Sequence, residues 1–273
     1  MSDELQPSAT TPAATNGKAA LEVRGVTKRF GALEVLRGID LTLHQGEVLG
    51  LVGDNGAGKS TLVKILSGFH PQDEGDLLIE GRSVRLTSVE SARTHGIETV
   101  YQDLALIPQL PVYQNLFLGH ELTKFGPLGV LDKRQMRKLS RQYLDDIHVN
   151  VPSVEADSDQ LSGGQRQAVA VARAVRVATK ILLLDEPLAA MGARESRLII
   201  NLVKDLAASG RVSIVVIDHN FAHLFELCDR LLVLQGGRIT VERHVHQTSL
   251  EELTELMVSS YRAQLEAVSE AGA

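Results

Sequence analysis

The chain of 273 residues is poor in cysteine and has no tryptophan. Its single cysteine, Cys228, cannot form a disulfide within the chain. No Cys/His cluster has the spacing of a zinc site either. These absences exclude a disulfide scaffold and a structural zinc domain, and they fit a protein of a reducing compartment.

Long apolar stretches are also missing. The longest apolar runs, such as residues 181–184 and 214–217, have the length of a β-strand. A membrane-spanning helix requires about 18 or more apolar residues, so we expect a chain that does not cross the membrane. Residues 1–20 are rich in Ala, Thr, Ser, Pro and Asn without an apolar core. They predict a disordered tail and not a secretion signal.

An excess of positive charge is the third absence. Lys and Arg total 28 against 34 Asp and Glu, which gives a net charge of −6. Nucleic-acid backbones attract basic surfaces, so a nucleic-acid partner is disfavoured. The apolar fraction of 44% is enough for one large domain with a sizeable core.

A glycine-rich loop of the phosphate-binding type follows residues 48–52, an apolar run typical of a strand buried on both faces. A helix is predicted from Ser60 to about Ser67. In this context the loop amides and the helix dipole face a phosphate group. The predicted nucleotide cradle comprises Gly53, Asp54, Asn55, Gly56, Ala57, Gly58, Lys59, Ser60 and Thr61.

Two residues of this P-loop carry specific chemistry. We expect Lys59 to neutralise oxygens of the β- and γ-phosphates and Ser60 to bind Mg²⁺ through its hydroxyl. The alternative is a tight turn that binds nothing. A lysine gives such a turn no structural benefit, which favours the phosphate site.

Two acidic residues end a second apolar strand, because Asp185 and Glu186 follow residues 181–184 directly. Successive strand residues point to opposite sides, so we predict separate roles for the two acids. Asp185 is expected to serve Mg²⁺, and Glu186 to act as general base for an attacking water. The alternative is a surface loop before Pro187, and the P-loop argues against it.

A second glycine-rich string precedes a predicted helix that runs to about Val177. The string consists of Leu161, Ser162, Gly163, Gly164 and Gln165. A helix N-terminus with glycines and a hydroxyl is again a candidate phosphate cradle. The P-loop already holds one nucleotide tail, so the second cradle needs a separate explanation.

In this order and spacing, the P-loop, the second string and the Asp-Glu pair resemble the nucleotide-binding subunit of an ATP-binding cassette (ABC) transporter. The resemblance spans about residues 21–245. It implies an α/β P-loop NTPase fold with a mixed sheet core, an antiparallel β subdomain and a helical subdomain at about residues 103–177. The alternation of strands and helices separately predicts a parallel sheet covered by helices. ATP and Mg²⁺ are the implied ligands.

The resemblance assigns roles to further residues. Gln102, which ends the strand predicted at residues 97–101, is expected to contact Mg²⁺ and the water. His219 is expected to hold the γ-phosphate, and Phe30 to stack on adenine, although Phe30 could equally be a core residue. Ser162, Gly164 and neighbouring amides would cap the γ-phosphate bound by another subunit. This implies a head-to-tail homodimer with two ATP molecules in its interface.

Two positions depart from the family pattern. Leu188 stands where Thr or Ser is usual, and the loop that commonly ends in Asp ends in Gly192. A glycine there resembles the subclass that serves monosaccharide importers. The two departures leave open how the two subunits of the implied dimer communicate.

Residues 96–108 and 115–119 resemble bacterial simple-sugar importers of the ribose, fructose and galactose type, and a single cassette is similar to the fructose importer's ATPase subunit. The resemblance implies a peripheral position on the cytoplasmic face of the cell membrane. The implied partners are a transmembrane permease and an extracytoplasmic sugar-binding protein. The alternatives are a soluble ATP-dependent regulatory module, an importer of a non-sugar substrate, and an exporter.

Two patterns near the C-terminus predict local structure. Gly236 and Gly237 separate two apolar runs, which predicts a hairpin with a two-residue turn. Ser249 begins a capping-box pattern, and an amphipathic helix is predicted within residues 246–273. Its apolar positions are Leu250, Leu253, Leu256, Met257, Tyr261 and Leu265. We expect this helix to pack on the domain, the alternative being a helix that binds a partner or a membrane surface.

Overall fold

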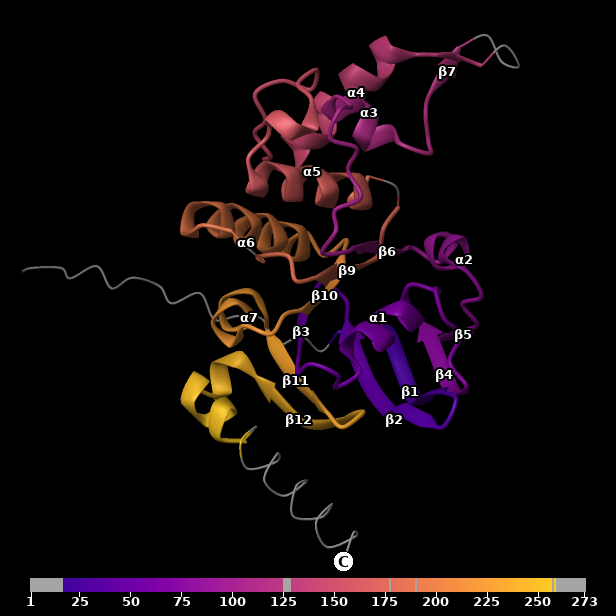
Figure 1. Ribbon diagram of the computed structural model, residues 1–273, viewed down its shortest axis with the longest axis vertical. Helices are drawn as coiled ribbons and strands as arrows, with labels where there is room; N and C mark the ends of the chain where they lie inside the picture. The colour runs from indigo at the N-terminus through magenta and orange to yellow at the C-terminus, as the bar shows by residue number, and fades with distance from the viewer. Residues whose placement is uncertain (1–16, 125–128, 177, 190, 257, 259–273) are drawn as a thin grey trace, which may run out of the picture.

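The central element of the fold is a six-stranded sheet in the order β12-β11-β3-β10-β9-β6 (Figure 1). The computed structural model describes residues 17–124, 129–176, 178–189, 191–256 and 258. The strands are β3 (Val48–Val52), β6 (Ile97–Val100), β9 (Ile181–Asp185), β10 (Ser213–Ile217), β11 (Arg230–Gln235) and β12 (Arg238–His244). All neighbouring pairs are parallel except β11 and β12. The predicted α/β class with a mixed sheet is confirmed.

The two faces of the central sheet bury two separate apolar clusters. Along β9, Leu182 and Leu184 belong to one cluster, whereas Ile181 and Leu183 belong to the other. Successive side chains of a strand point to opposite faces, so an unbroken apolar run supplies both clusters at once. One cluster lies under the helices between residues 112 and 227, and the other lies between the central sheet, a second, antiparallel sheet and the helix that follows the P-loop.

The antiparallel sheet has four strands in the order β2-β1-β4-β5. They are β1 (Ala19–Phe30), β2 (Leu33–His44), β4 (Glu74–Ile79) and β5 (Arg82–Val84). Glycines spaced along residues 21–50 favour short strands, but this prediction is wrong for β1 and β2, which have 12 residues each. Two of these glycines, Gly25 and Gly38, have positive φ angles inside the paired region. A register shift between Val23 and Val26 absorbs the irregularity as a β-bulge, so pairing continues.

Element boundaries differ from the predicted ones by one or two residues. β1 begins at Ala19, so the sheet includes two residues of the tail that we expected to reach residue 20. The helix after the P-loop, α1 (Lys59–Leu66), starts one residue before Ser60. A short helix, α2 (Val89–Thr94), follows β5 and is capped by Ser88. Such differences depend on local capping, which a sequence pattern specifies poorly.

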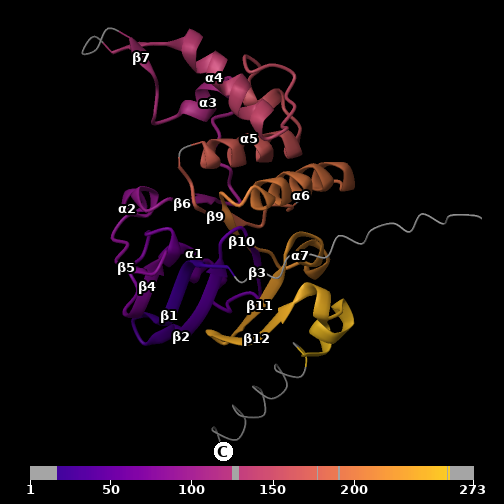
Figure 2. The ribbon, with the colours of Figure 1, turned by 180° about the vertical axis from the view of Figure 1, so that it is seen from behind.

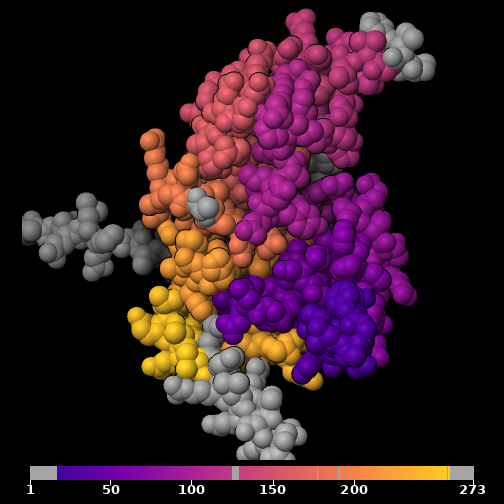
Figure 3. All heavy atoms as spheres, viewed as in Figure 1, coloured from indigo at the N-terminus to yellow at the C-terminus, as the bar shows by residue number. Residues whose placement is uncertain are grey.

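Above the central sheet in Figure 1 lie α6 (Ala193–Ala208) and α5 (Gly163–Val175), with α3 (Val112–Phe117) and α4 (Lys133–Asp146) at the top, and Figure 2 shows the same order from behind. The 3-10 turn η2 (Ser158–Gln160) precedes α5, and α7 (Phe221–Leu227) contacts β3 and α6. A small hairpin of β7 (Thr123–Lys124) and β8 (Val130–Leu131) precedes α4. In the space-filling view of Figure 3, the segments with α3 to α5 make up the upper part of the surface.

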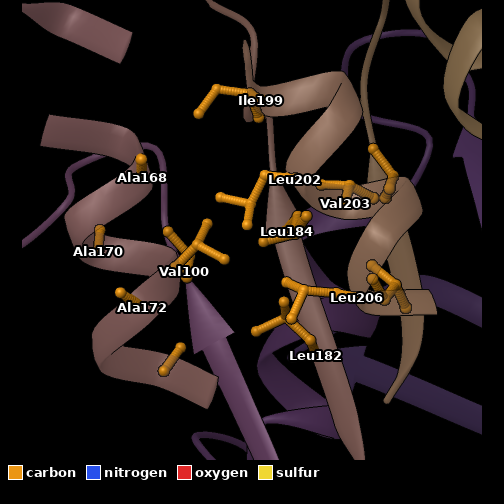
Figure 4. Close-up of a cluster of buried hydrophobic side chains, with 14 of the residues drawn as sticks. Val100, Ala168, Ala170, Ala172, Leu182, Leu184, Ile199, Leu202, Val203 and Leu206 are labelled. Carbon is orange, nitrogen blue, oxygen red and sulfur yellow. The ribbon is translucent and has the colours of Figure 1, made fainter. Parts of the chain in front are cut away.

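Small side chains allow α5 to pack closely on its neighbours. Ala168 and Ala172 are buried one helical turn apart on α5. Figure 4 shows them facing the side chains of Val100, Leu184 and Leu202, which come from β6, β9 and α6. Close packing of this kind fixes the position of the α5 N-terminus relative to the sheet, because the interior leaves little free volume.

The segment between β6 and α3 is held by a buried amide. The side chain of Asn115 is fully buried, and its Oδ1 accepts from the amide of Ile107 at 2.8 Å. Its Nδ2 donates to the carbonyl oxygens of Ile107 and Leu110 and to Ser158 Oγ. An amide with these partners satisfies the polar groups of an irregular segment that water does not reach.

The C-terminal region contains the predicted hairpin and the start of the predicted helix. β11 and β12 pair across Gly236 and Gly237, both with positive φ, which confirms the two-residue turn. The 3-10 turn η3 (Val245–Gln247) follows, and residues 250–256 are helical, with Leu253 buried in the core. Met257, Tyr261 and Leu265 lie outside the described residues.

Within the described part of the chain, no helix is both long enough and apolar enough to cross a membrane.

A buried ion pair joins the start of β11 to the turn before β3. Arg230 donates from Nε and Nη2 to the Glu47 carboxylate at 2.7 and 3.0 Å, and both side chains are about 95% buried. Arg230 also donates to the Thr42 carbonyl and to the exposed carboxylate of Glu242. A buried charge is stable only while its partner remains.

We expect Arg230→Met to lower the free energy of unfolding by about 3 to 5 kcal/mol, because it leaves the Glu47 charge buried without a partner. Urea unfolding followed by circular dichroism measures the change. Glu242→Gln is the matched control, since it removes an exposed partner of the same arginine and should cost less than about 1 kcal/mol. Equal losses in both variants would contradict the prediction.

Candidate functional site

Three segments that are far apart in the sequence meet at one edge of the central sheet. β3, β9 and β10 are parallel neighbours, and Ile217 pairs with both Leu51 and Asp185. The carboxyl ends of the strands therefore lie side by side. The P-loop leaves β3 at Gly53, the acid pair ends β9, and His219 follows β10. In open α/β sheets ligands bind at this edge.

The P-loop lies against β11 and its hairpin turn. A side-chain carbon at Gly53 would overlap the carbonyl oxygen of Leu234, so only glycine fits at this position. The amide of Gly237 also donates to the carbonyl oxygen of Ala57 at 3.2 Å. The loop conformation is therefore set by a strand almost two hundred residues further along the chain.

The Lys59 side chain is buried within the loop that precedes it. Its Nζ donates to the carbonyl oxygens of Gly53 at 2.5 Å and Asp54 at 3.0 Å. Burial lowers the pKa of Lys59, and the nearby carboxylates of Glu186 and other acids oppose that shift. A partly desolvated ammonium favours an anionic ligand beside it.

The N-terminus of α1 has no side-chain cap. Its N-cap residue is Gly58, so no side chain accepts from the first amides of the helix. Together with the glycine cradle and the buried ammonium, these amides are donors suited to phosphate oxygens. The residues present fit the triphosphate tail of a nucleotide.

Two adjoining hollows open above this edge. One, of about 340 Å³, is lined by most of the P-loop, by Asp185 and Glu186, and by Leu33 and Val35 of β2. The other, of about 370 Å³, is lined by the start of the P-loop, Glu186 and His219. The fold therefore brings together the P-loop residues, the two acids and the histidine that the sequence predicted as site residues.

The two acids have different environments. Burial raises the pKa of Asp185, the adjacent Glu186 raises it further, and Lys59 opposes the shift. Glu186 lies beyond the end of β9 and has a left-handed backbone with φ of 48°. Strand alternation therefore does not separate the two side chains, contrary to the prediction, because Glu186 lies in a turn beyond the strand. The Glu186 amide donates to the carbonyl oxygen of Ile217 at 2.8 Å, which holds that turn.

Glu186 also contacts the predicted histidine. His219 Nδ1 lies 3.1 Å from Glu186 Oε1. The sequence did not indicate the support beneath this pair: Asp218 is 2% exposed and accepts from the Asn220 amide at 2.9 Å. Its other oxygen lies 3.1 Å from His223 Nδ1. No motif distinguishes Asp218 or His223, so sequence patterns alone could not find them.

A magnesium ion would need more than protein ligands here. Among the described residues, no group of three or more His, Cys, Asp and Glu side chains is placed to hold a metal. Mg²⁺ often takes one or two protein oxygens plus substrate phosphates and waters. The exposed hydroxyl-bearing residue Ser60 and the carboxylate of Asp185 line one hollow and fit that mode.

Two predicted residues lie outside these hollows. Gln102 is exposed and comes two residues after β6, at the same sheet edge as the acid pair. Phe30 is 45% exposed, so the alternative that it is a core residue is wrong. Its ring makes an edge contact with the ring of His70 at 5.4 Å between centroids, and Lys28 Nζ lies 5.7 Å from the ring centre.

The second glycine string forms the N-terminus of α5 and lines neither hollow. The helix begins at Gly163, within the string itself. Ser162 is its N-cap, and Ser162 and Gln165 form a reciprocal capping box at 3.3 and 3.0 Å. Within one chain, the second cradle is therefore separate from the P-loop.

Of the two departures noted in the sequence, one has a plain structural role. Leu188 is 1% exposed and packs in the core cluster under the helices. Gly192 is the N-cap of α6, and the Glu195 carboxylate accepts from its amide at 3.5 Å. The pattern of an acid three residues after a helix start could have indicated Glu195 in advance.

Comparisons with known proteins found similar sequences and similar solved structures. A family model for ABC transporters matches residues 36–189. The xylose/arabinose import ATP-binding protein XylG of Sulfolobus acidocaldarius is 46% identical over 239 residues, covering 88% of this chain and 94% of that protein. The fructose import ATP-binding protein FrcA of Rhizobium meliloti is 43% identical, covering 80% and 85%.

A ribose import ATP-binding protein, RbsA of Chromobacterium violaceum, is 40% identical over 86% of this chain, which spans only 46% of that longer relative. Among solved structures, a cassette of an ABC transporter superposes with a TM-score of 0.78 at 25% identity, covering 89% of this chain and 98% of that one. A dimeric ATP-binding cassette in a post-hydrolysis state, bound to ADP and Pi, has a TM-score of 0.67 at 26% identity, covering 82% and 98%.

The raised pKa of Asp185 predicts a pH-dependent gain in stability for Asp185→Asn in nucleotide-free protein. The folded state disfavours the charged carboxylate, so the wild type loses stability as the pH rises from the unfolded pKa, about 4, through the folded pKa. The variant, which is neutral throughout, should be more stable at neutral pH, and the gain should vanish below about pH 4. Urea unfolding across this range measures it, with exposed Asp76→Asn as control. A gain that does not change with pH would contradict the prediction.

Proposed function

Because this chain belongs to the ABC transporter family, we propose that it is the ATP-hydrolysing subunit of an importer for a simple sugar. The observation that carries the proposal is the meeting of Lys59, Asp185, Glu186 and His219 around the P-loop at one sheet edge. The names of the three relatives, which are import proteins for xylose/arabinose, fructose and ribose, support the sugar class.

The P-loop residues hold the triphosphate of ATP. The uncapped amides of α1 and the Lys59 ammonium donate to phosphate oxygens, and Lys59 gives up its two loop carbonyls to do so. Ser60, Asp185 and Gln102 would hold Mg²⁺, which would supply charge neutralisation at the phosphates. The exposed ring of Phe30 stacks on adenine.

Glu186 is the general base for hydrolysis. The oxygen of a water forms a bond to the γ-phosphorus, while the bond to the β–γ bridging oxygen breaks and its electron pair leaves with ADP. The Glu186 carboxylate takes the proton from the water. His219, 3.1 Å from that carboxylate, orients it and contacts the γ-phosphate.

The separation of the two cradles within one chain supports a site that is completed by a second chain. Ser162, Gly163, Gly164 and Gln165 of one subunit cap the γ-phosphate held by the P-loop of the other, in a head-to-tail homodimer. The capping box leaves the Ser162 side chain at an exposed helix start, where a partner can reach it. A dimeric cassette is among the similar structures.

The same proposal includes the surroundings of the dimer. A transmembrane permease carries the sugar, and an extracytoplasmic binding protein delivers it. The chain itself sits on the cytoplasmic face of the membrane. Residues 103–177 include a helical subdomain that contacts the permease, residues 21–245 form the ATPase domain, and the described residues 250–256 begin the C-terminal helix.

We expect Glu186→Gln to keep ATP binding but to lower ATP turnover by about 10² to 10⁴, the usual range for losing a general base. A dimer should then accumulate with Mg-ATP and be visible by size-exclusion chromatography. Glu74→Gln, on an exposed strand position away from the site, is the control and should turn over ATP normally. If Glu186→Gln stays monomeric with Mg-ATP while the wild type is active, the sandwich dimer is wrong.

Monosaccharides should neither bind the isolated subunit nor change its ATPase rate, because the two hollows at the sheet edge are lined by the residues that we assign to ATP. A ligand shifts an equilibrium only through differential contacts. Stimulation should therefore appear only when permease and binding protein are reconstituted with the subunit in lipid vesicles. Saturable sugar binding to the purified subunit, measured by calorimetry, would favour a soluble regulatory module instead.

A further inference from the structure

The first turn of α6 packs directly on the second cradle. A side-chain carbon at Gly164 would lie 2.9 Å from the Cβ of Glu195, and one at Gly163 would lie 3.6 Å from its Oε2. α5 and α6 lie side by side in both ribbon views (Figures 1 and 2). Glycine is therefore needed at position 164 for the approach of Glu195, whatever ligand the cradle holds.

The Glu195 carboxylate lies between the N-termini of two helices. Its Oε2 accepts from the Gly192 amide at 3.5 Å, which caps α6. The hydroxyl of Ser162 lowers the pKa of Glu195 most, followed by the amides of Gly164 and Gly192. The nearby guanidinium of Arg166 acts in the same direction. Both helix dipoles present their positive ends to this carboxylate.

Two of these donors have another assignment in the proposed function. Ser162 and Gly164 are the groups that cap the γ-phosphate of a partner subunit. A carboxylate and a phosphate are both anions, and an amide or hydroxyl that faces one cannot at the same time serve the other. In the single chain, the donors of the second cradle therefore already face an anion, the Glu195 carboxylate.

We propose that Glu195 is a positioning residue that occupies the second cradle until the γ-phosphate of the partner subunit replaces it. Its carboxylate keeps Ser162 and Gly164 oriented toward an anion and withdraws to the Gly192 amide when the dimer closes. Gly192 ends the loop that begins at Glu186, so the exchange links the cradle to the hydrolytic loop of the same chain. This inference rests on the proposed head-to-tail dimer.

The exchange and a purely structural cap predict opposite effects on dimer formation when the charge of Glu195 is removed. If Glu195 only stabilises α6, removing its charge weakens the dimer or leaves it unchanged. If Glu195 competes with the γ-phosphate, removing its charge eases closure. Glu195→Gln keeps an oxygen that accepts from Gly192 and loses only the negative charge.

The test places Glu195→Gln in the Glu186→Gln background, which traps the dimer, and titrates Mg-ATP by analytical ultracentrifugation. We expect the ATP concentration for half-maximal dimer to fall at least about threefold, which is the scale of one relieved like-charge contact near a surface. The monomer's own ATP affinity should not change, because Glu195 serves the nucleotide of the partner. Asp132→Asn, which neutralises the N-cap of α4, is the matched control and should leave the midpoint unchanged.

An unchanged or higher midpoint in the double variant overturns the inference while leaving the proposed dimer intact. Glu195→Ala in the same background is the second variant: it loses the α6 cap but also vacates the cradle, so it too must dimerise at lower ATP. Urea unfolding checks that each variant is folded. Failure of Glu186→Gln alone to dimerise overturns the proposed function itself, and the inference with it.

Discussion

Parallel pairing of β3, β10 and β9 is the constraint on which the rest of the structure depends. Strands buried on both faces must satisfy their backbone groups within the sheet, and parallel pairing places all their carboxyl ends at one edge. The P-loop, the acid pair and the histidine each follow one of these strands. The site is thus a consequence of strand order, because the three segments are far apart in the sequence and meet only through strand pairing.

Burial at this edge also sets the charge balance of the site. Lys59 and Asp185 have pKa shifts in opposite directions, and burial is the main cause of both. Each shift disfavours the charged form of its group, so the nucleotide-free site holds charges that a bound anion and a cation would stabilise.

Glycines at two cradles serve packing as much as ligand binding. Gly53 is pressed against the Leu234 carbonyl, and Gly164 against the first turn of α6. In both cases a distant element fixes a loop that a motif describes only locally. The glycines of such a motif are therefore required for packing as well as for ligand binding. We expect a substitution at either glycine to affect both packing and binding.

The sequence by itself determined the α/β class, the P-loop helix, the β11–β12 hairpin and the apolar strands, because periodicity and turn chemistry act over a few neighbouring residues. It also singled out Lys59, Asp185, Glu186 and His219. Only the tertiary structure decided how long β1 and β2 are, since cross-strand pairing carries them past Gly25 and Gly38. It alone revealed Asp218 beneath His219 and Glu195 beside Ser162. Glu195 and Ser162 lie about thirty positions apart on different helices, so no local pattern encodes their contact. Asp218 is next to His219 in the sequence, but only the fold shows that it is buried.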